Sequence, residues 1–201
     1  MKKKDTFKTG LIFIISIFVI ICTPSFAFPK GKEAPAGDKD KRPLGQEEGS
    51  MKVFFTDPEW DGITVPEGQQ CLRDKGNGFT PALAVKNIPP GTEAVIMEYS
   101  DRSYPPMDNG GHGKIGFYVQ KKSVEINIPA VPGHTFNLDD GFFLVAAQAD
   151  PAHDKAGAYM PPCCGGRGNS YYVTVKAVKI ISFEDKKHEV LAEVVKEMGR
   201  Y

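Results

Sequence analysis

The sequence predicts an all-β-dominated fold: a β-sandwich of short, mostly antiparallel strands followed by one C-terminal α-helix. From residue 51 onward, short apolar runs alternate with turns rich in Gly, Pro, Asn and Asp. Residues 124–128 alternate apolar and polar side chains with a period of two, as a half-buried strand does. Many short strands separated by turn signals at this spacing are typical of a β-sandwich.

Eight segments are predicted to be strands. Residues 94–97 and 142–147 are nearly continuous apolar runs, so we expect them to be buried on both faces. Turn signals separate the segments at residues 87–91, Pro132-Gly133 and Asp140-Gly141. The predicted strands cover residues 52–56, 62–65, 82–85, 94–99, 115–119, 124–128, 142–148 and 171–181.

The one predicted helix covers residues 184–198, at the end of the chain. Its apolar residues recur at helical spacing among Glu and Lys, which is the pattern of an amphipathic helix with one buried stripe. The stripe consists of Phe183, Val190, Leu191, Val194, Val195 and Met198.

Residues 1–27 have the pattern of a secretory signal peptide. Lysines dominate its start, residues 11–22 form an apolar core broken by a single serine, and Ser25-Phe26-Ala27 offers small residues for a cleavage site. The alternative is an uncleaved membrane anchor, but the apolar run is short for a span of about 20 residues. Cleavage predicts a periplasmic or secreted protein without a transmembrane segment.

Residues 28–50 are predicted to be a disordered linker, because they are rich in Lys, Pro, Gly and Glu and nearly lack large apolar side chains. The folded domain is then expected to cover residues 51–201. Residues 1–27 hold four of the 25 basic and one of the 25 acidic residues, so 21 basic and 24 acidic residues remain, a net charge of −3. Without a basic field, nucleic acid is not expected as a partner.

Three cysteines remain after processing: Cys71, Cys163 and Cys164. In an oxidising compartment an odd number favours one disulfide and one free thiol. Because adjacent cysteines rarely pair, we expect Cys71 to pair with Cys163 or Cys164, which closes a loop of about 90 residues and contributes roughly 4–5 kcal/mol to stability. The alternative is three buried free thiols.

A polar, turn-rich loop at residues 100–112 is the first candidate for a binding site, since it places Asp101 and His112 at the ends of two predicted strands. Asp101 has two interpretations. It is a structural turn residue, or it has a functional role in which it accepts a hydrogen bond from a ligand or orients His112. His112 lies between Gly111 and Gly113, which permit close backbone approach and leave the imidazole uncovered. A structural histidine is the alternative. The other histidines show no metal-ligand spacing, so no metal is expected.

A second Gly/Pro-rich loop, residues 160–169, also precedes a strong strand. Its successive glycines expose N–H groups that can form an anion-binding nest, and Arg167 can add a charge-assisted contact. The alternative is a turn pinned by the disulfide.

The chain carries no motif that predicts catalysis or a cofactor. It has no Gly-x-Ser-x-Gly nucleophile elbow, no P-loop and no dinucleotide fingerprint. A cysteine nucleophile at Cys163 or Cys164, paired with His112, is disfavoured by the oxidising compartment and by the expected disulfide. We therefore expect a protein that is not an enzyme and uses no cofactor.

Four ordered segments between about residues 62 and 180 resemble the phosphatidylethanolamine-binding protein (PEBP) family, which includes Raf kinase inhibitor protein and bacterial YbhB/YbcL-type proteins. Residues 80–94 (TPALAVKNIPPGTEA) are similar to its Ser/Thr-Pro-x-Leu-x-Trp…Pro-x-Gly-Thr segment, and residues 100–105 (SDRSYP) to its Asp-Pro-Asp-x-Pro loop. His112 stands in the position of its pocket histidine. Pro161-Pro162 and residues 169–175 resemble its Pro-Pro…Gly-x-His-Arg-Tyr segment.

The chain also departs from the family pattern. Arg102-Ser103 replace Pro-Asp, Asn169-Ser170 replace His-Arg, and Val85 replaces a frequent Trp. The resemblance implies a PEBP-like β-sandwich with a small pocket for an anion or phosphorylated head group, and the departures leave the ligand open. The implied ligand-binding residues are Asp101, Tyr104, Pro105, His112, Pro162 and Asn169.

The function expected from the sequence is non-catalytic binding of a small anionic or phosphorylated ligand, such as a lipid head group. His112 and Asn169 would donate to an anionic oxygen, and Tyr104 and Pro162 would form the walls of the site. The alternative is an inhibitor or interaction module with a protein partner, a secreted enzyme, recognised by an exposed loop or by residues 28–50. A weakly active hydrolase dependent on His112 is a third hypothesis.

Overall fold

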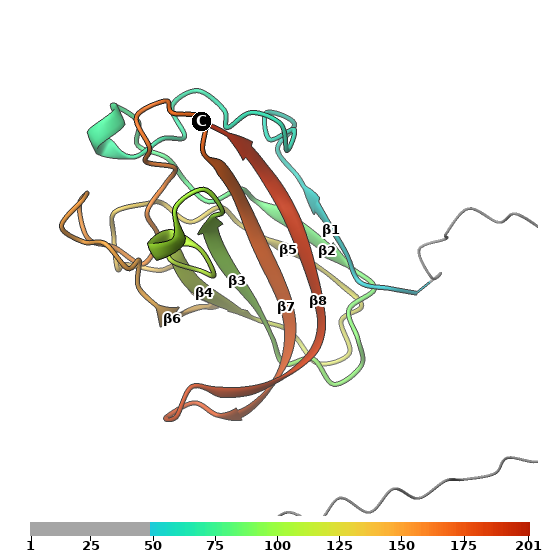
Figure 1. Cartoon of the computed structure of the whole chain (residues 1–201). Helices are drawn as coiled ribbons and strands as arrows, with labels where there is room; N and C mark the ends of the chain where they lie inside the picture. Colours follow the sequence, from blue (N-terminus) through green and yellow to red (C-terminus); the bar gives the residue numbers. More distant parts are fainter. Residues whose placement is uncertain (1–48) are drawn as a thin grey trace, which may run out of the picture. The chain divides into compact units, whose positions relative to one another are not determined.

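The computed structural model describes residues 49–201 (Figure 1). The expected signal peptide and residues 28–48 of the expected linker lie outside the described residues. The described part is all-β, with two antiparallel sheets. Its two helical segments are 3-10 turns of three residues each, η1 at Leu72–Asp74 and η2 at Pro105–Met107. The predicted sandwich of antiparallel strands is therefore confirmed.

The smaller sheet has three strands in the order β1-β2-β5, and the larger sheet has five in the order β6-β4-β3-β7-β8. All neighbouring strands are antiparallel. The strands are β1 (Lys52–Phe55), β2 (Leu83–Lys86), β3 (Ala94–Asp101), β4 (Gly113–Tyr118), β5 (Glu125–Ile128), β6 (Phe142–Ala146), β7 (Ser170–Ser182) and β8 (Lys187–Arg200).

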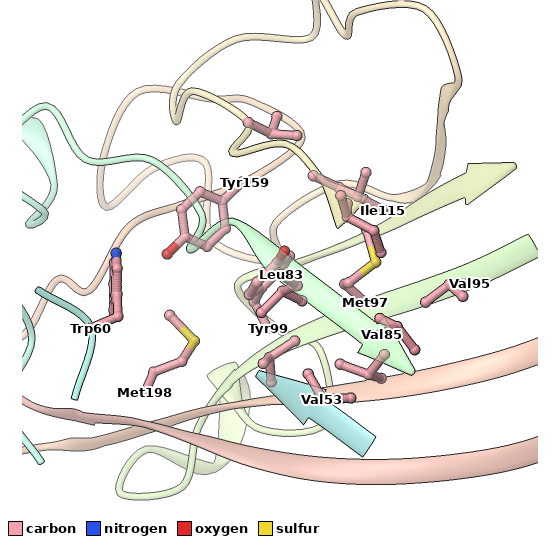
Figure 2. Close-up of a cluster of buried hydrophobic side chains, with 14 of the residues drawn as sticks. Val53, Trp60, Leu83, Val85, Val95, Met97, Tyr99, Ile115, Tyr159 and Met198 are labelled. Atoms are coloured by element: carbon pink, nitrogen blue, oxygen red, sulfur yellow. The ribbon is translucent and has the colours of Figure 1, made fainter. Parts of the chain in front are cut away.

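The main core lies between the two sheets. Figure 2 shows side chains of the small sheet, such as Leu83 and Val85, beside Val95 and Met97 of the large sheet. These four side chains are fully buried. The register pairs Met97 with Ile115 on one side and with Val175 on the other, so apolar side chains of three adjacent strands lie on the same face. The inward-facing side chains of these strands thus form a continuous apolar layer.

The predicted C-terminal helix is wrong, because residues 187–200 form strand β8, which pairs with β7 along most of its length. Ala192 lies opposite Ala177, and Val194 lies opposite Val175. Ala192 and Val194 both pack against the core. Val190 and Val195 instead remain about half exposed, at 46% and 50%. The pairing with a long neighbouring strand outweighs the local helical preference, which is a weak determinant of structure.

Seven of the eight predicted strands overlap observed strands, and one does not. Residues 62–65 form an isolated parallel bridge between Thr64 and Arg200 instead of a strand. The central strand β3 is buried on both faces except at Glu98, as predicted. Strand β6 is only half-buried, contrary to the prediction, because it lies at an edge of its sheet.

Cys71 and Cys163 form a disulfide that joins positions 92 residues apart. Cys164 is a buried free thiol, and its Sγ donates to the main-chain oxygen of Tyr201 at 2.7 Å. One disulfide and one free thiol are what the odd number of cysteines predicts. Between residues 49 and 201 no helix is both long enough and apolar enough to cross a membrane.

Candidate functional site

A cavity of about 370 Å³ lies at one end of the large sheet. Strand β3 ends at Asp101, and the antiparallel β4 and β7 begin beside it, with Tyr99 opposite Gly113 and Asp101 opposite Tyr171. The two candidate loops therefore meet at the same end of the sheet. The cavity is lined by Asp101, Ser103, Tyr104, Met107, His112, Asp150, His153, Met160, Cys163, Arg167 and Asn169.

Four of the six predicted ligand-binding residues line this cavity: Asp101, Tyr104, His112 and Asn169. The two prolines lie elsewhere. Pro105 is exposed in η2, and Pro162 is buried, with its carbonyl accepting a hydrogen bond from Cys71 N at 3.0 Å. Pro162 thus holds the loop that carries the disulfide, and neither proline forms a wall of the cavity.

The His112 ring is fixed by the main chain of Met160. Its Nδ1 lies 2.7 Å from the Met160 carbonyl oxygen, and its ring packs edge-on against Tyr171 with centroids 5.4 Å apart. Because a carbonyl only accepts, Nδ1 is the protonated nitrogen, and the neutral ring then presents a lone pair at Nε2. Burial lowers the pKa of His112, opposed by the Met160 hydrogen bond and by the charge of Asp101.

Gly113 allows the close backbone approach that positions His112. Its φ is +124°, and a Cβ at this position would lie 2.1 Å from the carbonyl oxygen of Ala158. Two residues further on, Met160 N donates to the His112 carbonyl at 2.9 Å. The close backbone approach predicted for this glycine is therefore present, because a side chain would separate β4 from the segment that fixes the ring. The imidazole, which was expected to be uncovered, is instead almost fully buried, because Met160 and Tyr171 pack against it.

Asp101 holds the two loops together. Its Oδ1 accepts from Ser103 N at 2.8 Å, and its Oδ2 accepts from Asn169 Nδ2 at 2.6 Å. The carboxylate is almost fully buried, so these bonds replace its hydration. The Met160 carbonyl, and not Asp101, orients His112 through Nδ1. Asn169 keeps one amide N–H and its Oδ1 for other partners.

Asp150 and His153 also line the cavity. The sequence analysis did not identify them as site residues, because no motif distinguishes the loop after β6. His153 Nδ1 lies 3.8 Å from Asp150 Oδ2, and its Nε2 contacts Arg73 Nη1. Arg73 also donates through Nη2 to the Cys163 carbonyl at 2.9 Å, which links η1 to the cavity wall. Arg167 was considered on sequence grounds as an anion contact, and the structure places it at the cavity.

The charged side chains that line the cavity nearly balance. Asp101 and Asp150 contribute two negative charges and Arg167 one positive charge, which gives −1 while the His112 imidazole is neutral. Protonation of His112 would bring this sum to zero, so the cavity would repel an anion less when that imidazole is charged.

Cys71, Cys163 and Asp154 form a group whose potential ligand atoms lie within 4.8 Å of one another. Both sulfurs belong to the disulfide, and metal ions bind cysteine as the thiolate. The group therefore cannot act as a dithiolate site while the disulfide is intact.

The lowered pKa of His112 predicts a pH-dependent stability. The unfolded chain takes up the histidine proton near pH 6.5 and the folded protein only at lower pH, so acidification below about 6.5 favours unfolding. We expect this residue to reduce the free energy of unfolding by up to about 1.4 kcal/mol per pH unit within that window. Urea denaturation of wild type and of His112→Gln between about pH 5 and 7 measures this, and equal pH slopes would contradict it.

The sequence matches no protein-family model, and no curated protein matches it. Among solved structures, the chain is similar to the crystal structure of a protein from Chlamydia trachomatis described as a homolog of the phosphatidylethanolamine-binding proteins. The identity is 18%, and the alignment covers 76% of this chain and 97% of the other, with a TM-score of 0.46.

Proposed function

We propose that this protein is a non-catalytic, PEBP-like binding protein that takes a small anionic or phosphorylated ligand in the cavity at the strand ends. The observation that carries the proposal is the tethered His112, whose Nδ1 is bound to a main-chain carbonyl so that Nε2 is the nitrogen left for a ligand. The ordered sequence resemblance supports it. The Cys71–Cys163 disulfide is compatible with the proposed secreted or periplasmic location.

Three groups would contact the ligand. Protonated His112 would donate from Nε2 to an anionic oxygen, Asn169 would donate its second amide N–H, and Arg167 would contribute a charge-assisted contact. Asp101 would not contact the anion, because its carboxylate serves the loop N–H of Ser103 and the amide of Asn169. Ligand binding would stabilise the imidazolium and so raise the pKa of His112 again.

The proposal that the site is not catalytic rests on the states of its cysteines. Cys163 lines the cavity, but its sulfur is in the disulfide and is therefore no nucleophile. Cys164 is buried, and its thiol is directed to the Tyr201 carbonyl. The histidine at the cavity thus lacks a thiol partner of the kind that cysteine hydrolases require.

Thermal-shift titration with inorganic phosphate and with phosphoethanolamine tests this function. We expect a saturable rise in Tm for wild type that is larger near pH 5.5 than near pH 8, since the imidazolium is the donor. His112→Ala should lose the rise. Lys52→Ala, which removes a positive charge from β1 of the smaller sheet, is the control and should retain it.

Two results would contradict the proposal. Equal shifts at both pH values would exclude His112 as the donor, and equal shifts in wild type and His112→Ala would place the ligand elsewhere. A response to phosphoethanolamine but not to phosphate would indicate that the organic part of the head group contributes to recognition.

A further inference from the structure

A second, apolar groove lies on the outer face of the five-stranded sheet, beneath the tip of the β7–β8 hairpin. Strand side chains alternate between faces, so Val95 and Met97 enter the main core while Ile96 joins a separate small cluster. Val178 and Ile180 of β7 belong to the same outer cluster. The cavity that His112 lines lies by the start of β7, where Tyr171 is opposite Asp101, whereas the hairpin tip follows the other end of β7 at Ser182 (Figure 1).

Aromatic packing keeps this groove formed. The Phe143 ring covers Gly116, where a Cβ would lie 2.1 Å from the ring, and it packs against Tyr118 with centroids 4.7 Å apart. Phe183 of the hairpin tip adds a third ring, 6.3 Å from Phe143. Lys186 Nζ donates to the Val145 carbonyl at 2.8 Å, so the tip is tied to the edge strand β6. The groove is therefore walled by both the sheet and the tip.

Two lysines give the groove a basic rim. Lys186, Lys187 and His188 belong to the lining, and none of the lining residues carries a carboxylate. The acidic neighbour Asp185 is engaged in the turn, where its carboxylate accepts from Ser182 Oγ at 3.1 Å. Glu189 lies opposite Lys179 in the β7–β8 register. An anionic group at the rim would therefore meet positive side chains without a competing carboxylate in the groove.

The volume limits what can enter. The groove measures about 170 Å³, whereas sites for drug-sized molecules occupy roughly 300–1,000 Å³. A single alkyl chain fits this space better than a fused ring system. Apolar walls combined with a positive rim select a molecule that has an apolar tail and one negative group.

We propose that the groove beneath the β7–β8 tip binds a single-chain anionic amphiphile, with its tail against Ile96, Val178 and Ile180 and its carboxylate at Lys187 and His188. This site is separate from the cavity at the strand ends. It does not depend on His112, and it uses burial of the tail as its main source of affinity.

Isothermal titration of the whole protein with straight-chain carboxylates of increasing length, below their micelle concentrations, tests the proposal. Affinity should rise about fourfold per added methylene until the groove is filled, because each buried methylene contributes a constant increment. Alkylamines and alkanols of the same length should bind more weakly, since they lack the negative group.

Three variants make the test specific. Lys187→Glu should weaken carboxylate binding about three- to tenfold through loss and reversal of an exposed charge. Lys75→Glu, an identical charge change beside η1, is the matched control and should have no effect. Ile180→Trp should fill the groove and reduce binding of every chain, and a Tm near that of wild type would show that it folds.

The proposal is overturned if amines bind as tightly as carboxylates, if Lys187→Glu leaves the affinity unchanged, or if Ile180→Trp binds normally. Sedimentation of wild type and Ile180→Trp tests a different occupant. Dimerisation of wild type that Ile180→Trp abolishes, without carboxylate binding, would assign the groove to a second copy of the chain. His112→Ala should bind carboxylates normally, which separates this site from the proposed phosphate site.

Discussion

Replacing Cys71 and Cys163 together by alanine is expected to lower the free energy of unfolding by about 4–5 kcal/mol. The disulfide closes a loop whose ends are 92 residues apart, so its loss enlarges the conformational freedom of the unfolded chain. Both half-cystines are also buried in a small cluster with Met107 and Met160. Guanidinium chloride denaturation of the oxidised wild type and of the double variant measures the difference.

Cys164→Ser is the matched control. It changes the adjacent buried sulfur and keeps a donor for the Tyr201 carbonyl, so its effect should be much smaller. A loss in the double variant no greater than that of Cys164→Ser would show that the disulfide contributes little. Addition of a reductant to wild type should reproduce most of the loss, because it opens the same loop.

Gly113→Ala should cost about 3 kcal/mol or more and should also weaken phosphate binding. The substitution combines an unfavourable φ of +124° with a Cβ placed 2.1 Å from the Ala158 carbonyl oxygen. Relief of that overlap requires β4 to move away from the segment that carries Met160, whose carbonyl fixes His112. Thermal denaturation and the phosphate titration together measure both effects.

Gly91→Ala separates the two causes. Gly91 also has a positive φ, +87°, but a Cβ there meets nothing within 4 Å. It should therefore cost only about 1 kcal/mol, from the backbone conformation alone. Equal losses in the two variants would show that the close approach at Ala158 does not constrain the strand.

The strands were predictable where the sequence carries its own turn signals. Residues 124–128 alternate strictly, and residues 125–128 form β5; the apolar run at residues 94–97 is buried in β3. The segment at residues 184–198 misled the prediction, because apolar residues at positions 190, 191, 194, 195 and 198 fit a helical stripe. Its true partner is β7, and that pairing is a tertiary property that periodicity cannot reveal.

The candidate site also depends in part on tertiary contacts that the sequence pattern does not reveal. Asp101 and His112 could be predicted because each lies at the end of a predicted strand, and antiparallel neighbours bring such ends together. Asn169 was assigned to the site through family resemblance. Asp150 and His153 come from a loop whose path depends on contacts with η1, which no local pattern encodes. The two prolines were assigned to the cavity through family resemblance, and the structure places both outside it.

Strand β8 also has a consequence for self-association. It forms one edge of the five-stranded sheet, and an unpaired edge can recruit the edge of another molecule. Near its end, Arg200 bridges to Thr64, which covers that part of the edge. Along the remainder, Lys187, Glu189, Glu193 and Lys196 place charges of both signs among the valines. Pairing this edge with another molecule would bury these charges, which is unfavourable, so the residues that resembled an amphipathic helix would disfavour aggregation through this edge.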